Sequence, residues 1–101
     1  LSRIEAGRFI PPDRECELAE LCRAAVDQVA PLAERHVCPV ALELEQEPLA
    51  VAGDPAQLLQ LLDNLLSNAI RYGGNGVVLR AQVERGQPTV QVRDSGPGIA
   101  A

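Results

Sequence analysis

One stretch of this chain constrains its fold more than any other. Between Asp54 and the glycines that begin at Gly73, apolar residues recur at helical spacing along a single arc. The arc consists of Leu58, Leu62, Leu65 and Ala69, widened by Leu59, Leu66 and Ile70. Asp54 is a good N-cap, and Pro55 suits the first helical position. Gln57 lies three residues after the N-cap, where a capping box has Glu or Gln. We therefore predict a helix from Pro55 to about Tyr72 that needs an apolar layer against one side.

Short strands are predicted on both sides of this helix. Residues 40–44 alternate between apolar and polar, which is the period of a strand with one wet face, and residues 49–52 form a brief second strand. After the helix, residues 77–83 and 89–93 read as two strands joined by a short turn at 86–88.

The first third of the chain predicts a second helix and a boundary. A short strand at 15–17 precedes apolar residues at helical spacing over 18–35, where Pro31 should weaken or kink the last turn. Residues 1–7 are typical of the last turns of a helix that enters from upstream, and the Pro11-Pro12 pair in 8–14 marks a domain boundary.

The order of these elements predicts the fold class. Strands in near-consecutive pairs with helices between them favour an α+β fold, a two-layer α/β sandwich in which one mixed sheet carries its helices on one face. With 101 residues the chain fits one domain. It contains no Met, so we expect a fragment or a processed piece of a longer protein.

Composition excludes several classes of site. All nine basic residues are Arg, which removes any P-loop, Schiff-base or general-base lysine. The aromatic residues are Phe9 and Tyr72 alone, and the net charge is −5, so stacking on single-stranded nucleic acid and charge-driven nucleic-acid binding are excluded. The cysteines at 16, 22 and 38 show no CxxC spacing, which argues for structural thiols in a reducing cytoplasm. No apolar run approaches the roughly 18 residues of a membrane span.

Two asparagines stand out on the polar arc of the long helix. Asn64 and Asn68 lie one turn apart, and Asn is a poor helix former. One interpretation is a plain solvated helix face. The other is that the two side-chain carbonyl oxygens serve a hard cation such as Mg²⁺.

The end of the chain offers a second candidate. Asp94 follows a strand and begins a segment with Gly96 and Gly98, which permit close approach of a ligand. The carboxylate accepts hydrogen bonds only and suits an exocyclic amine such as that of adenine. An ordinary Asp/Ser/Gly/Pro turn explains the same residues.

Together these two segments resemble a known family. The stretch 64–72, then two strands, then 94–99, is similar to the N box and first glycine box of the ATP-binding domain of bacterial sensor histidine kinases, in the superfamily of DNA gyrase B and heat-shock chaperone ATPases. The resemblance implies a Bergerat-type ATP-binding fold that is incomplete at its C-terminus. It makes residues 1–12 the end of the dimerisation and phosphoacceptor helix with a linker, and 13–101 the N-terminal part of the catalytic domain.

The resemblance also implies roles for individual residues. Asn68 would coordinate the Mg²⁺ that bridges the ATP phosphates, assisted by Asn64, and Asp94 would accept from the adenine amine. Arg71, where the family commonly has Lys, would offer positive charge to the phosphates, and its planar fork differs from a lysine. The remaining nucleotide contacts would be Tyr72, Gly96, Gly98 and Ile99.

Asn64 carries a further implication. Hydrolytic members of the superfamily have Glu at that place to activate water, and an amide cannot accept this proton at neutral pH. The parent would then transfer the γ-phosphoryl of ATP to a protein histidine and on to a response regulator. The acceptor histidine is expected upstream of residue 1, because His36 fits a structural role at a helix end.

Other interpretations remain open at this stage. The same fold could be a docking or dimerisation module with a non-functional ATP site, or an anti-sigma-factor serine kinase, against which the helix end at 1–7 argues. Further strands and a second glycine box are expected beyond residue 101, so we expect weak or no nucleotide binding and no kinase activity by the chain alone. An unpaired sheet edge would make a homodimer possible. The parent would be cytoplasmic, with anchoring in the inner membrane left open.

Overall fold

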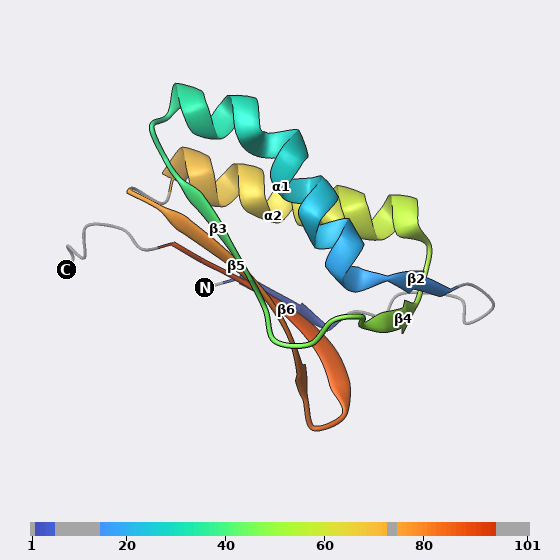
Figure 1. Cartoon of the computed structure of the whole chain (residues 1–101). Coiled ribbons are helices and arrows are strands. Elements are labelled where there is room, and N and C mark those ends of the chain that lie inside the picture. The colour runs from blue at the N-terminus through green and yellow to red at the C-terminus, as the bar shows by residue number, and fades with distance from the viewer. Residues whose placement is uncertain (1, 6–14, 73–74, 95–101) are drawn as a thin grey trace.

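The computed structural model describes residues 2–5, 15–72 and 75–94, and Figure 1 shows their arrangement. The elements in chain order are β1 (Ser2–Glu5), β2 (Glu15–Glu17), α1 (Leu18–Arg35), β3 (Val40–Leu44), β4 (Ala50–Ala52), α2 (Pro55–Tyr72), β5 (Val77–Glu84) and β6 (Gln87–Asp94).

Two layers make up the molecule. A four-stranded mixed sheet has the order β1-β6-β5-β3, in which β3 runs parallel to β5 and the other neighbours are antiparallel. Both helices lie on one face of this sheet, as Figure 1 shows. The predicted two-layer α+β fold is therefore confirmed. The prediction of one sheet is wrong in one respect, because β2 and β4 pair with each other in a separate two-stranded sheet.

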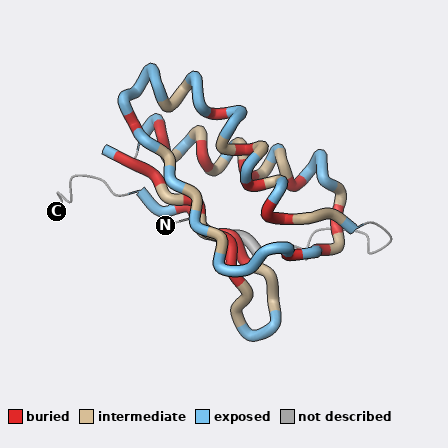
Figure 2. Tube along the Cα trace, in the orientation of Figure 1, coloured by how far each residue is buried: buried red, intermediate tan, exposed pale blue. Residues whose placement is uncertain are grey.

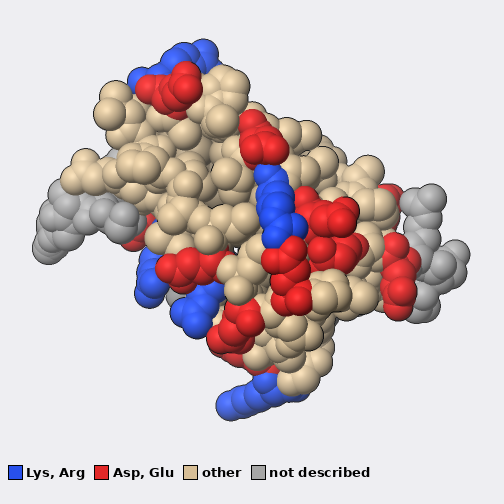
Figure 3. Space-filling model, viewed as in Figure 1, with Lys and Arg blue, Asp and Glu red and all other residues tan. Residues whose placement is uncertain are grey.

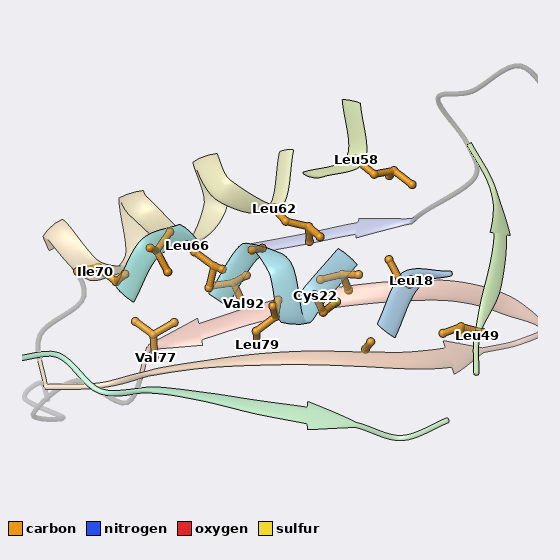
Figure 4. Close-up of a cluster of buried hydrophobic side chains, with 14 of the residues drawn as sticks. Leu18, Cys22, Leu49, Leu58, Leu62, Leu66, Ile70, Val77, Leu79 and Val92 are labelled. Atoms are coloured by element: carbon orange, nitrogen blue, oxygen red, sulfur yellow. The ribbon is translucent and has the colours of Figure 1, made fainter. Parts of the chain in front are cut away.

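The core lies between the helix layer and the sheet. In α2 the buried side chains are Leu58, Leu62, Leu66 and Ile70. The predicted stripe runs instead through Leu65 and Ala69, which are only half-buried, so the buried arc is shifted around the helix toward the residues predicted to widen it. Figure 4 shows them facing Val77, Leu79 and Val92 of the sheet, with Leu18 and Cys22 of α1 in the same cluster. Buried residues line the facing sides of the two layers in Figure 2. Aliphatic packing thus fixes which arc of α2 turns outward.

The N-terminal strand corrects one prediction. Residues 2–5 form β1 and pair antiparallel with β6 from Ser2 opposite Val92 to Glu5 opposite Thr89, with an ion pair from Arg3 to Glu84. The helix predicted for 1–7 is therefore wrong. Two helical turns alone are too short to be stable, whereas the outer edge of β6 offers unpaired backbone groups to an extended segment. The predicted boundary at 8–14 lies outside the described residues.

Helix α1 covers its predicted range and continues past Pro31 to Arg35. Its C-terminal end has unusual backbone geometry. The Val37 N–H donates to the Glu34 carbonyl oxygen at 3.1 Å. The Cys38 N–H donates to the Ala33 carbonyl oxygen at 2.9 Å, which completes a Schellman-type ending after the C-cap His36. Val37 therefore occupies the left-handed position usually held by Gly, at φ 50°.

The β5–β6 hairpin turns earlier in the chain than predicted. Arg85 and Gly86, both with positive φ, make the two-residue loop. Gln87 and Pro88 belong to β6 rather than to the turn. Pro88 is tolerated because it sits next to the pair that closes the hairpin, where its nitrogen faces away from β5. On the other side of β6, the described pairing with β1 ends with Glu5 opposite Thr89.

Candidate nucleotide site

Helix α2 begins where the sequence predicts. The Ala56 N–H donates to Asp54 Oδ1 at 3.0 Å, and the Leu58 N–H donates to the Asp54 carbonyl oxygen at 3.0 Å. Asp54 is thus the N-cap, with Pro55 at the first helical position. The cap fixes the residue at which the helix begins. The buried leucines pack against the core, and this packing fixes which arc of the helix faces solvent.

The outward arc of α2 carries the two predicted asparagines. Asn64 and Asn68 are both exposed and lie one helical turn apart on the same side. Gln57, Gln60, Leu61 and Asn64 line an open depression of about 300 Å³ on this arc. The sequence pattern places Gln57 and Gln60 on the polar arc without a role. Because Gln60 and Gln57 lie four and seven residues before Asn64, helical spacing alone could have placed them beside Asn64.

Asp94 ends β6 on the side of the sheet that the helices cover. Val90 and Val92 are buried under the helices, and alternate residues of a strand point to the same face. Asp94 therefore lies on the same side of the sheet as α2. Its Cα is opposite Val77, and Figure 4 shows Val77 close to Ile70 in the last turns of α2.

A thiol near this corner is affected by the Asp94 charge. Burial, and then the negative charge of Asp94, raises the pKa of the Cys38 thiol. Cys38 precedes β3 and is 2% exposed. Asp94 therefore lies near the start of β3 as well as near the end of α2, at one end of the molecule. The raised pKa keeps Cys38 protonated near neutral pH, which fits the structural role predicted for it.

The remaining predicted site residues divide into two groups. Arg71 and Tyr72 are exposed in the last turn of α2, and Tyr72 is 82% exposed. Gly96, Gly98 and Ile99 lie outside the described residues. The structure thus brings Asn64, Asn68 and Arg71 onto one helix face and places Asp94 at the same end of the sheet.

The donor set fits a metal that takes most of its ligands from elsewhere. Within residues 2–5, 15–72 and 75–94, no group of three His, Cys, Asp or Glu side chains is arranged to hold an ion. Two amide oxygens on α2 would supply only part of a coordination shell. Mg²⁺ commonly keeps waters and takes phosphate oxygens in addition to one or two protein ligands, so Asn64 and Asn68 fit Mg²⁺ carried by a nucleotide.

The depression on α2 differs in charge from the acidic face of the molecule. Figure 3 shows Asp and Glu side chains spread over the face that α1 and the segment around β3 and β4 present. Arg23 pairs there with Glu47, and Arg80 pairs with Glu45 at 3.3 Å. The lining of the α2 depression contains no carboxylate. A polyphosphate would therefore meet less repulsion at α2 than on the acidic face.

Comparison with known proteins decides the family. Residues 53–101, which include both asparagines and Asp94, match the family described as "Histidine kinase-, DNA gyrase B-, and HSP90-like ATPase". These residues belong to this ATPase family. The chain is 35% identical to the sensor protein GacS of Pseudomonas syringae pv. syringae over 99% of its length. It is 37% identical to the probable sensor histidine kinase TcrY of Mycobacterium tuberculosis over its whole length.

Solved structures agree with this histidine kinase assignment. The catalytic domain of histidine kinase ThkA superposes with a TM-score of 0.75 at 27% identity, over 83% of this chain and 58% of that domain. The cytoplasmic segment of histidine kinase QseC gives a TM-score of 0.68 at 27% identity, over 96% of this chain and 64% of that segment. The chain spans 12% of GacS and 21% of TcrY. In the part of the chain that the structure describes, neither helix is long and apolar enough to cross a membrane.

Proposed function

We propose that this chain forms the first part of the ATP-binding catalytic domain of a sensor histidine kinase. The observation that carries the proposal is the position of Asp94 on the helix-covered side of the sheet, at the end where α2 presents Asn68. In this proposal residues 13–101 belong to the catalytic domain, whose sheet also includes β1 through its pairing with β6.

Each residue has a role that its chemistry allows. The Asp94 carboxylate accepts a hydrogen bond from the exocyclic amine of adenine, which favours adenine over guanine. Asn68, assisted by Asn64, holds the Mg²⁺ that neutralises charge on the phosphates. Arg71 adds a positive charge at the C-terminal end of α2, and Tyr72 offers its ring beside the base. Gly96, Gly98 and Ile99 complete the wall of the site.

The proposed reaction is transfer of the γ-phosphoryl group of ATP to a histidine of the dimerisation and phosphoacceptor domain, for relay to a response regulator. Catalysis of this kind depends mainly on positioning and on electrostatic stabilisation. Because the Asn64 amide cannot act as a general base, the site holds ATP without activating water. The proposed partners are therefore the phosphoacceptor domain, a response regulator and a second copy of the kinase. The proposed location is the cytoplasm, where ATP is available.

Nucleotide titration of the full-length protein tests this proposal. We expect the Asn68→Ala and Asp94→Ala variants to lose at least about tenfold in affinity for Mg-ATP, since each loses a contact to a charged or polar group of the ligand. Gln28→Ala and Asp27→Ala, which change exposed residues of α1, are the matched controls and should bind as the unaltered protein does. Unchanged affinity in both site variants would contradict the proposal.

A further inference from the structure

The row of amides on α2 extends beyond the two asparagines. Gln60 lies one turn before Asn64, as Asn64 lies one turn before Asn68, and all three are exposed on the outward arc. Four residues of α-helix rise about 6 Å, so the three amides are evenly spaced along about 12 Å of the helix surface. The family resemblance that implies roles for Asn64 and Asn68 gives none to Gln60.

Gln60 also faces space that a ligand could fill. It lines the depression of about 300 Å³ with Gln57, Leu61 and Asn64. Among the described residues, none donates a hydrogen bond to the Gln60 side chain or accepts one from it. Its amide is therefore available, and the absence of a carboxylate from the lining leaves the depression open to an anion.

The direction of a bound nucleotide follows from the ends of the elements. Asp94 lies opposite Val77 in the sheet, and Val77 belongs to the same buried cluster as Ile70 in the last turn of α2. In the proposed site Asn68 and Asn64 serve the phosphate end, so a nucleotide whose base contacts Asp94 would direct its phosphates along α2 toward the N-terminal end, past Asn68 and then Asn64. Side chains on a helix lean toward its N-terminus, which carries the amides further in the same direction.

We propose that Gln60 donates a hydrogen bond to the terminal phosphate of a bound nucleoside triphosphate and so favours the triphosphate over the diphosphate. This inference rests on the proposed function of the site. An amide N–H is a neutral donor, and a hydrogen bond to a charged phosphate oxygen is stronger than one between neutral groups. The diphosphate is one phosphate shorter, so it ends before it reaches Gln60.

The experiment compares two ligands in the full-length protein. Isothermal titration with a non-hydrolysable Mg-ATP analogue and with Mg-ADP gives two affinities for each variant. We expect Gln60→Ala to weaken binding of the triphosphate about tenfold and to leave that of the diphosphate unchanged. Gln60→Glu has nearly the same shape but replaces donors with a negative charge, so it should weaken triphosphate binding further.

Controls make each outcome decisive. Gln28→Ala, an exposed glutamine of α1, should bind both ligands normally. Equal losses for both ligands, or no change in Gln60→Ala and Gln60→Glu, would overturn the role of Gln60 while leaving the nucleotide site in place. If the unaltered protein binds neither ligand, the proposed function itself fails. Because Gln60 is exposed, thermal unfolding should show that both variants keep the fold.

Discussion

At the scale of single residues, the chemistry of Asn64 is central to the proposed nucleotide site. Asn64 is exposed on the outward arc of α2 and lies one turn from Asn68. A carboxylate in its place could take a proton from water, whereas the amide offers only a weak acceptor and two donors. In the proposed site, this one side chain would therefore distinguish holding ATP from hydrolysing it.

Asn64→Glu should raise ATP hydrolysis by the full-length protein. The new carboxylate would supply a general base, an effect typically of about 10²-fold or more when the base is well placed. Release of inorganic phosphate measures the change, and Asn64→Gln is the control because it keeps an amide. An unchanged rate of phosphate release in Asn64→Glu would count against the position assigned to Asn64.

Val37 shows a residue-scale feature that stability measurements can test. Its φ of 50° places a β-branched side chain in the left-handed region, and the side chain is 84% exposed. The sequence does not predict this turn, because no Gly or Asn marks it. The helix nevertheless ends there, since the hydrogen bonds of Val37 and Cys38 to the last carbonyls require the left-handed conformation.

Val37→Gly should raise the free energy of unfolding by about 1 kcal/mol. Gly removes the steric cost of the left-handed conformation, about 1–2 kcal/mol, but loses some of that gain through the larger entropy of the unfolded chain. Val37→Ala keeps the Cβ and should change stability little. Urea unfolding compares the three proteins, and destabilisation by Gly would contradict steric strain at Val37.

At the scale of elements, Glu17 joins three of them. Its Oε2 atom accepts from the Ala19 N–H at 2.9 Å, at the start of α1, and from the Leu49 N–H at 2.8 Å, just before β4. The Leu18 N–H donates to the Leu49 carbonyl oxygen at 2.8 Å. Glu17 itself ends β2. One carboxylate therefore caps α1 and holds the small β2–β4 sheet against it.

The stability of this junction should depend on pH. The hydrogen bond from the Leu49 N–H, followed by that from Ala19, lowers the pKa of Glu17 below its usual 4.5. The folded state thus binds the proton less tightly than the unfolded state does. The stabilisation is complete above the unfolded pKa and is lost as pH falls through the lower folded pKa.

Urea unfolding over a pH series measures this dependence. Glu17→Gln should be less stable than the unaltered chain near neutral pH, and the difference should shrink as the solution is acidified below about pH 4.5. Glu43→Gln, an exposed carboxylate of β3, is the control and should keep the pH dependence of the unaltered chain. The charge of Glu17 would have no such role if the difference in free energy of unfolding between Glu17→Gln and the unaltered chain stayed the same at every pH.

The elements differ in how well the sequence predicts them, and the reason is physical. The pattern predicts helix α2 from Pro55 to about Tyr72, as the structure has it, since the cap at Asp54 and the recurring leucines are local signals. It does not predict β1, because the conformation of that strand depends on a partner strand some ninety positions away. It also misplaces the end of the β5–β6 turn, since Pro88 reads as a turn residue and lies in a strand.

Site residues follow the same distinction. The asparagines share one helix, so spacing alone places them together, as it does Gln60. Their position relative to Asp94 depends on how β6 lies under α2, which no local pattern contains. The register of the β5–β6 ladder, with Asp94 opposite Val77, is what places Asp94 on the side of the sheet that the helices cover.

At the scale of the whole molecule, the candidate nucleotide contacts are few. The chain covers 58% of the ThkA catalytic domain and 64% of the QseC cytoplasmic segment. In the described residues the candidate contacts come from one face of α2 and the end of β6. A triphosphate held by so few groups leaves most of its charge facing water, and little of the ligand is buried.

The chain by itself should therefore bind Mg-ATP with a dissociation constant above about 1 mM. This corresponds to a binding free energy weaker than about 4 kcal/mol. Isothermal titration of the chain measures this, with the full-length protein as the comparison. Sub-millimolar binding by the chain alone would show that its 101 residues suffice for the site.

The most direct test of the proposed nucleotide site is a crystal structure of the full-length protein or its whole catalytic domain with Mg²⁺ and a non-hydrolysable ATP analogue. We predict the adenine amine within hydrogen-bond distance of the Asp94 carboxylate and the metal ion bound at the Asn68 side chain. A nucleotide whose base lies away from Asp94, or a metal ion bound away from the outward arc of α2, would contradict it.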